Sequence, residues 1–519
     1  MIQRVILLAA LSGPLPKLGV IAVAGLAAAA LLAREQRLQA IAIVAALLLA
    51  PILLLADIWH SPQLGVVHRH PLVAAVGGVV AVGGIALLAA VIARRPGLFA
   101  ALVVVAVPFR IPIEAAGITS NLLVPLYLVV GAGSLAFAVP ALLRGDGARR
   151  EPSARDPVDP VLRDAIRWIE RLLALYVVLY ALQSFYSPDF EKALQQMVFF
   201  YVPFALMFAL LRRISWTTQL LRTCLLLAVG LALLFSVVGF AEYATKTLFL
   251  NPKLIAENNV HTYFAINSVF FDADIFGRFL ALVMILLAAV LVYSRREREQ
   301  LTVVVVLAIL WAALVLTLSR SSLSALLVGL GILAALRWSA SRTVIIAAVV
   351  VALGVAAVAI SPNTFGLNQG LNGASSGRAG LVSGGVTMFE QRPLWGYGSG
   401  AFVYEYRRQN PGTSQNLAAS HTIAVTIGAE QGLIGELPYV ALVVACAIGL
   451  ARGARPDVAR AAIAAAFIAL VFHTQLYADF LEDPLTWTLL GVGTALPFSR
   501  PSRERGGATP AGEVAAVPA

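Results

Sequence analysis

The sequence predicts an all-α protein that crosses a membrane many times. Sixty per cent of its 519 residues are hydrophobic and only 13% are charged, whereas about a quarter of the residues of a soluble domain are usually charged. Apolar runs long enough to cross a hydrocarbon core of ~30 Å recur from one end of the chain to the other. Arginine-rich segments fall in every second connection between these runs. We therefore expect about 12–15 transmembrane helices and one large extracytoplasmic loop.

The apolar runs define the candidate spans in order along the chain. They cover residues 18–33, 39–56, 72–93, 97–113, 121–143, 168–186, 194–211, 219–241, 277–293, 301–318, 322–336, 343–361, 433–451, 458–476 and 484–498. Arginine clusters mark the cytoplasmic connections of bacterial membrane proteins. Their alternation predicts a cytoplasmic C-terminus and places residues 362–421 outside.

These spans divide the chain into six regions, of which two are polar and lie in the cytoplasm. Residues 144–167 form a linker rich in proline and charge, and residues 501–519 form a disordered tail of alanine, glycine and proline. The other regions are N-terminal helices (1–143), central helices (168–361), an extracytoplasmic catalytic loop (362–432) and C-terminal helices (433–500).

The positions of the charges argue against a nucleic-acid partner despite the net charge of +11, because the arginines follow the membrane pattern. Cys224 and Cys446 lie within predicted apolar helices, and this favours neither a disulfide nor a metal cluster. His60, His68 and His70 have no acidic or cysteine neighbours, so we predict no metal site there. No cofactor is expected.

The polar stretch from Gly377 to Leu437 is the predicted active-site segment. It carries arginines, a histidine, aromatic residues and glycines between two apolar spans. A long polar connection inside a hydrophobic protein is usually functional or disordered. Its mixture of charge and aromatic residues argues against disorder.

Two arginines near outer helix ends are candidate phosphate ligands. Arg320, in LTLSRSSLSALL, lies where two apolar spans meet on the predicted outer face. It could anchor a helix end by snorkelling, but the inside-positive rule disfavours arginine there and favours an anionic ligand. Arg378 follows a Gly/Ser-rich lead-in that exposes backbone N–H groups, and the residues after it are predicted to be helical.

Downstream, the run PLWGYGSGAF alternates aromatic residues with glycines. Trp395 and Tyr397 could stack on sugar rings or lie at the membrane interface, while the glycines serve backbone conformation. Arg392 could pair with Glu390 or cap a helix end.

Further along, His421 is predicted to begin a helix capped by Ser420 and to titrate near neutrality. Glu430 lies about 13 Å along that helix from His421, too far to pair with it.

The segment HTIAVTIGAEQGLIG resembles the signature of bacterial O-antigen ligases and related polysaccharide polymerases. His421, Gly432 and Gly435 hold the signature positions, whereas Thr422 departs from the usual residue. The segments LSRSS, GRAGLVSGGVTMFEQRPLWGYGSG and SVFFDADIFGRFL, which contains Asp272, Asp274 and Arg278, are also similar to the family. The resemblance covers about residues 260–440.

The resemblance implies a C-superfamily glycosyltransferase in the inner (cytoplasmic) membrane. Such enzymes take the glycan from a polyprenyl-diphosphate-linked donor on the extracytoplasmic side and pass it to a glycan or glycolipid acceptor. Arg320 and Arg378 would then neutralise the diphosphate without a metal. His421 would deprotonate the acceptor or orient the diphosphate. Arg278, Arg392, Trp395 and Tyr397 are the further substrate-binding candidates.

The sequence leaves other activities open. A polysaccharide polymerase and a protein O-glycosyltransferase share these features with a ligase. A transporter or flippase for lipid-linked glycans would need ionisable residues near mid-span. The predicted spans have almost none away from their ends, so we favour a transferase.

Overall fold

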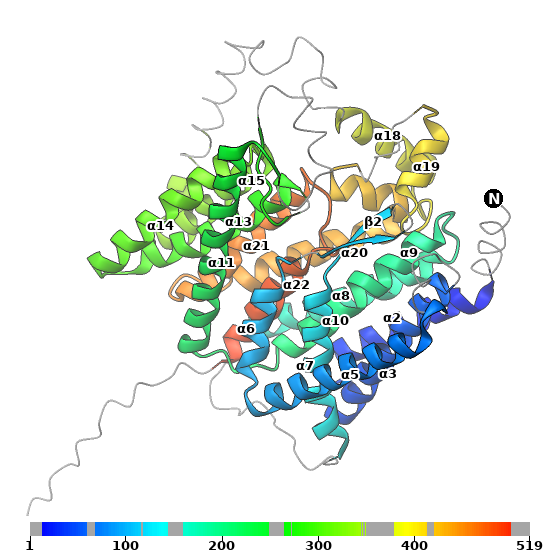
Figure 1. Ribbon diagram of the computed structural model, residues 1–519. Coiled ribbons are helices and arrows are strands. Elements are labelled where there is room, and N and C mark those ends of the chain that lie inside the picture. The colour runs from blue at the N-terminus through cyan, green and yellow to red at the C-terminus, as the bar shows by residue number, and fades with distance from the viewer. Residues whose placement is uncertain are drawn as a thin grey trace, which may run out of the picture.

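The computed structural model is a bundle of α-helices (Figure 1). It describes residues 13–59, 68–109, 111–115, 118–143, 159–248, 264–270, 272–343, 345, 348, 378–412 and 420–499. Several predicted features lie outside these ranges: His60, most of the linker, most of the span at 343–361, parts of the catalytic loop at 362–377 and 413–419, and the tail after residue 500.

The helices of the first half account for the predicted N-terminal spans. They are α2 (Pro14–Leu32), α3 (Gln36–Ile58), α5 (Pro71–Arg94), α6 (Gly97–Ala106), α7 (Val124–Leu143), α8 (Pro160–Ser184), α9 (Phe190–Gln196), the π-helix η3 (Met197–Tyr201), α10 (Val202–Leu211) and α11 (Thr218–Thr245).

The second half contains the helices that surround the predicted site. They are α13 (Ala273–Tyr293), α14 (Glu297–Leu316), α15 (Arg320–Arg337), α18 (Arg378–Gln391), α19 (Phe402–Gln409), α20 (Ile423–Ala451), α21 (Val458–Thr474), α22 (Pro484–Ala495) and the short 3-10 helix η6 (Leu496–Phe498).

The predicted fold class, an all-α polytopic membrane protein, is confirmed. Within the described ranges, ten helices are long and apolar enough to cross a membrane, and α6 and α21 are shorter apolar helices. The residues at several helix N-termini explain where those helices begin. Aspartates cap α8, α13, α21 and α22 with their side chains, and proline stands in the first turn of α2, α5, α8 and α22, both of which favour helix initiation.

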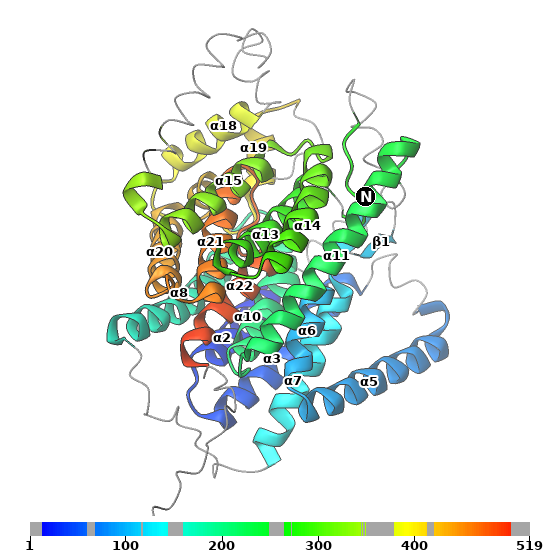
Figure 2. The ribbon, with the colours of Figure 1, turned by 90° about the vertical axis from the view of Figure 1, so that its left-hand side faces the viewer.

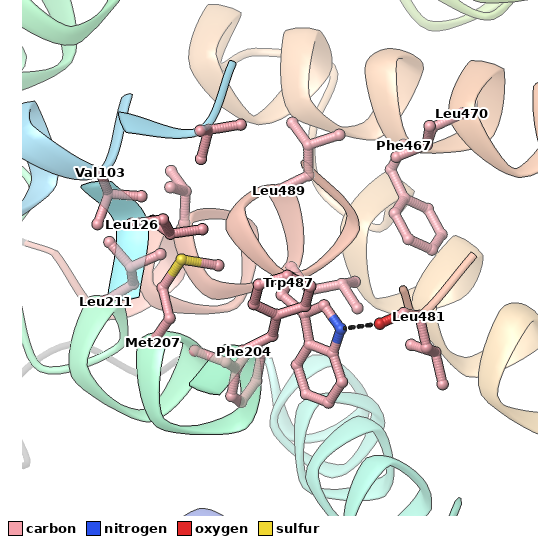
Figure 3. Close-up of a cluster of buried hydrophobic side chains, with 14 of the residues drawn as sticks. Val103, Leu126, Phe204, Met207, Leu211, Phe467, Leu470, Leu481, Trp487 and Leu489 are labelled. Atoms are coloured by element: carbon pink, nitrogen blue, oxygen red, sulfur yellow. Dashed lines mark hydrogen bonds between the residues drawn. The ribbon is translucent and has the colours of Figure 1, made fainter. Parts of the chain in front are cut away.

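The core lies where helices from distant parts of the chain meet around Trp487. Figure 3 shows this indole among side chains of α6, α7, α10, α21 and α22, with Phe204, Met207 and Phe467 nearby. The Trp487 side chain is fully buried, and its Nε1–H donates to the Leu481 carbonyl at 2.9 Å. That bond satisfies the only polar group that burial of an indole would otherwise leave unpaired.

Three predicted boundaries differ clearly from the structure. Helix α8 begins at Pro160, so the end of the predicted linker at 144–167 is helical. The span at 97–113 is helical only to Ala106. Residues Ile111–Ala115 (β1) instead pair antiparallel with Ile118–Leu122 (β2), and Pro108 and Pro112 interrupt the apolar run there. The span predicted to begin at 433 also starts earlier, because α20 begins at Ile423.

Helices α18 and α19 lie across one end of the bundle (Figures 1 and 2). Both pack against α20, and α13, α15 and α21 pack against one another. The N-terminal ends of α13, α15, α18 and α20 and the C-terminal end of α21 therefore meet, and the candidate site is at this junction.

Candidate active site

The structure divides the predicted site residues into two groups at opposite ends of α18. Arg378 is the first described residue of that helix, and Arg392 follows its last residue. At 1.5 Å per residue, the two ends lie about 20 Å apart. Arg378 faces the junction of α13, α15, α20 and α21, whereas Arg392 belongs with Trp395 and Tyr397.

Asp274 is at the centre of the first group. It lies in the first turn of α13, where its backbone N–H donates to the Asp272 side chain at 2.6 Å. Its Oδ2 accepts a hydrogen bond from Arg378 Nη2 at 3.3 Å, and Arg378 Nη1 donates to the Leu476 carbonyl at 3.4 Å. The Arg378 side chain remains 39% exposed, so this guanidinium can still contact a ligand.

Serines of the LSRSS segment hold the other side of the Asp274 carboxylate. Asp274 Oδ1 accepts from the Ser319 hydroxyl and, at 2.9 Å, from the Ser321 hydroxyl. Ser322 Oγ donates to the Asp274 backbone carbonyl at 3.2 Å. All three serines are buried: Ser319 caps α15, and Ser321 and Ser322 face inward from its first turn.

His473 of α21 lies beneath these serines, fully buried, with Nε2 3.2 Å from both Ser321 Oγ and Ser322 Oγ. Each hydroxyl has one proton, and Asp274 oxygens accept both. This arrangement favours the tautomer of His473 that donates from Nε2. Its Nδ1 accepts no hydrogen bond from the described residues.

His421 lies in the short turn before α20, with its ring 6.0 Å from the ring of Tyr477. The predicted helix start is wrong by two residues. The helix begins at Ile423 with Thr422 as its N-cap, and His421 has φ +61°. Ser420 does not cap the helix but stabilises the turn before it, since its hydroxyl accepts a hydrogen bond from the Thr422 N–H at 3.1 Å.

Burial and the nearby Arg378 charge lower the pKa of His421 from its ordinary value, and Asp274 opposes that shift. The imidazole is therefore neutral at pH 7 and has a nitrogen available to accept a proton. Tyr477 completes this side of the site. Its hydroxyl donates to Asp272 Oδ2 at 3.0 Å, and burial raises the pKa of that phenol well above its usual range.

Arg320 and Arg278 differ in their exposure. Arg320 is the first residue of α15 and is exposed. A cation there opposes the helix dipole, so an anion bound at this end would stabilise both. Arg278 is 1% exposed in α13, with Nη1 3.1 Å from Asp483 Oδ2. Its predicted contact with substrate stays a prediction; the geometry favours a role in joining α13 to the start of α22.

The second group surrounds a hollow of about 580 Å³. Its lining residues are Tyr186, Arg392, Pro393, Leu394, Trp395 and Gly396. The Trp395 side chain is 60% exposed. Tyr397 is buried, and the Arg392 guanidinium carbon lies 4.3 Å from the centre of its ring. Arg392 and Trp395 can therefore contact a ligand, whereas the geometry favours Tyr397 as a support for Arg392.

A break in α20 anchors the glycine-rich run that forms this hollow. Gly432 has φ +62° and ψ −162° within the helix, and this frees backbone groups on both sides. Gly398 N donates to the Glu430 carbonyl at 2.7 Å, and Leu433 N donates to the Pro393 carbonyl at 2.7 Å. The buried Glu430 carboxylate accepts from Gly400 N at 2.8 Å and Phe402 N at 3.0 Å. The loop thus satisfies the groups that the break exposes.

The glycines of the PLWGYGSGAF run adopt backbone conformations that favour glycine, as the sequence predicts. Gly396, Gly398 and Gly400 all have positive φ, which glycine adopts without strain. A Cβ on Gly396 would lie 2.3 Å from the Glu430 carbonyl carbon, so this position also needs glycine for its close approach to α20.

Residues 303–440 match the family model described as O-antigen ligase. This segment of the chain is therefore similar to the O-antigen ligase family. This confirms the resemblance that the sequence showed. No curated protein matches the chain. The matched region runs from α14 through α15, α18 and α19 into α20, and it contains Arg320, Arg378 and His421.

Helices outside the matched region also contribute residues to the candidate site. Asp274 comes from α13, before it, and His473 and Tyr477 come from α21 and the turn that follows. The sequence indicated Asp274 but no role for it, and it did not indicate His473. A histidine at the end of an otherwise apolar span is the signal that could have found it. Among the described residues, no group of three or more potential ligands could hold a metal ion.

Proposed function

We propose that the protein is a glycosyltransferase that moves a glycan from a polyprenyl-diphosphate donor to an acceptor hydroxyl. The active site would lie on the extracytoplasmic side of the inner membrane, as in O-antigen ligases. One observation carries this proposal: the half-exposed Arg378 and the neutral His421 face the same junction, within the segment that matches the O-antigen ligase family. A cation for the leaving group and a proton acceptor for the nucleophile therefore occur together.

The reaction breaks the bond between the anomeric carbon and the diphosphate oxygen. The electron pair of that bond goes to the leaving diphosphate, so negative charge grows on its oxygens. Fixed cations stabilise this charge more in the transition state than in the ground state. Arg320 suits this task because it begins α15, whose N-terminus also favours an anion. Arg378 suits it because its guanidinium lies at the junction and remains partly exposed.

The acceptor hydroxyl oxygen forms the new bond to the anomeric carbon, and its proton goes to His421. A histidine of lowered pKa stays neutral to lower pH than an ordinary one, so the base is ready at pH 7. Activity should therefore be level around neutrality and should fall only when the pH drops below the depressed pKa of His421.

The hollow at Arg392 and Trp395 lies too far from Arg378 to hold the reacting sugar. A glycan chain has sugars remote from the reacting carbon, and an exposed indole beside a guanidinium can bind such a sugar by stacking and hydrogen bonding. We assign this hollow to a remote part of the donor or acceptor glycan. Trp395→Ala should then raise KM for a long glycan and leave KM for a short one unchanged.

The experiment compares donor binding and turnover of detergent-purified variants, with a polyprenyl-diphosphate-linked glycan as the donor. Arg378→Ala and Arg320→Ala should each lower turnover by about 10²–10³-fold and weaken donor binding. Lysine at either position should restore only part of the turnover and donor binding, because lysine lacks the planar guanidinium group that can form two parallel hydrogen bonds. His421→Ala should bind donor like the parent but fail to transfer.

The outcomes are distinct. Normal turnover by all three folded alanine variants contradicts the proposed site. Loss of donor binding in His421→Ala, as severe as in the arginine variants, assigns His421 to the diphosphate and removes its role as base. A lipid-A-type acceptor and a second lipid-linked repeat unit, offered separately, distinguish ligase from polymerase.

A further inference from the structure

We propose that Asp274 is a positioning residue, whose carboxylate holds the Arg378 guanidinium next to His421 before the donor binds. The inference rests on the proposed function, since it assigns Arg378 to the leaving diphosphate. Asp274 lies on α13, outside the region that matches the O-antigen ligase family. The matched region would thus depend on a neighbouring helix for the geometry of its main cation.

The Asp274 carboxylate is itself fixed in place. Its Oδ1 accepts from the hydroxyls of Ser319 and Ser321, and its Oδ2 accepts from Arg378 Nη2 at 3.3 Å. Its own backbone is held by Asp272 at the helix start and by the Ser322 hydroxyl. These contacts come from α13 and α15, which pack directly on each other. The carboxylate therefore has one orientation in which to present an oxygen to Arg378.

The ion pair between Asp274 and Arg378 orients the guanidinium more than it stabilises the fold. The Arg378 and Asp274 side chains are 39% and 17% exposed, and partly exposed ion pairs contribute little to folding. Arg378 needs such a guide because a long side chain at the first described residue of α18 has many rotamers. Fixing it in advance removes an entropic cost from the catalytic step.

Asp274 also contributes to the electrostatic environment of His421. The groups that face this imidazole are Arg378 from α18, Asp274 from α13 and the Tyr477 phenol from the turn after α21. Burial and Arg378 lower the pKa of His421, whereas Asp274 raises it. Removing the Asp274 charge must therefore lower this pKa further, and a purely structural defect has no reason to do so.

The decisive variant is Asp274→Asn in the full-length protein, which keeps the shape of the side chain and removes its charge. We expect kcat to fall about 10–100-fold, since misplacing a catalytic group by about 1 Å has an effect of that order. The KM for the donor should not rise, because the Asp274 carboxylate no longer competes with the donor diphosphate for Arg378. An Arg378→Ala variant should instead raise donor KM.

A second readout does not depend on turnover. Diethyl pyrocarbonate modifies neutral imidazole, so the pH dependence of modification at His421, followed by peptide mass spectrometry, reports its pKa. The midpoint should move to lower pH in Asp274→Asn and to higher pH in Arg378→Gln. Asp164→Asn is the matched control: it removes an exposed carboxylate that pairs with Arg167 at 3.4 Å, and neither kcat nor the midpoint should change.

An unchanged midpoint in Asp274→Asn, or a donor KM that rises as in Arg378→Ala, overturns the proposal. If Asp274→Asn fails to fold, Ser321→Ala tests the same idea by removing one hydroxyl that orients the carboxylate. It should lower kcat at constant KM, and parental kcat overturns the proposal. A parent protein that transfers no glycan contradicts the proposed function, while the modification midpoints still decide the role of Asp274.

Discussion

At the residue scale, Arg320 occupies a position that is unusual for arginine, the first residue of a helix. This cation opposes the dipole of α15, an arrangement that costs free energy unless an anion binds there. Arg378 also keeps 39% of its side chain exposed. Under the proposed function, the donor diphosphate would be the anion that these guanidinium groups bind.

The two arginines lead to a prediction about metal dependence. Transfer by the purified protein should survive EDTA, because guanidinium groups neutralise the diphosphate in place of a divalent cation. The measurement is turnover before and after chelation, with a magnesium-dependent glycosyltransferase treated in parallel as the control. Abolition by EDTA and recovery with magnesium or manganese would contradict this account.

At the scale of elements, the break in α20 joins the O-antigen ligase signature to the glycine-rich run. Gly432 provides the positive φ at the break, and a Cβ there would lie 2.5 Å from the Leu394 carbonyl carbon. Gly435 lies one turn further on, where a Cβ would lie 2.2 Å from that of Gln431. The two signature glycines therefore serve backbone geometry, whereas His421 has the proposed role in catalysis.

Replacing Gly432 by alanine should destabilise the protein by about 1–3 kcal/mol from backbone strain alone, with a further loss from the clash with Leu394. The melting temperature in detergent should fall accordingly. Gly331→Ala is the matched control, because this helical glycine of α15 has nothing within 4 Å of an added Cβ. Alanine there should preserve or raise stability by about 1 kcal/mol. Equal melting temperatures would argue against a structural role for the break.

At the scale of the whole molecule, the arginine clusters predict the orientation in the membrane. The charged segments at 295–299 and 452–460 fall on the predicted cytoplasmic side, and residues 362–421 on the other. The structure places α18 and α19 together across one end of the bundle (Figure 2). This end should face away from the cytoplasm.

Cysteine labelling tests this orientation. A membrane-impermeant maleimide added to intact cells should modify a cysteine at Asn410, which is exposed at the end of α19, and spare one at Glu297, exposed in the first turn of α14. The natural Cys224 and Cys446 are buried and give a low background. Permeabilised cells should label both positions. Labelling of Glu297→Cys alone in intact cells would reverse the orientation and place the site in the cytoplasm.

The fold class and the segments that form the candidate site could both be predicted from the sequence. Apolar length and charge position decide which runs can cross a bilayer, and both are local properties. The glycines at 396, 398 and 400 were likewise identifiable, because few other residues adopt positive φ without strain. The boundaries of the elements were harder to predict from the sequence. The length of an apolar run predicts neither the β1–β2 hairpin after α6 nor the residue at which α20 begins.

Which of these residues lie together depends on how the helices pack. Arg378 and Arg392 are close in sequence, but α18 separates them, whereas Asp274, Ser321, Arg378, His421 and Tyr477 meet from five separate segments. Periodicity gives the face of a helix but not its neighbour, so the sequence could not pair Asp274 with Arg378 or place His473 beneath the serines. Packing of α13, α15 and α21 decides those contacts.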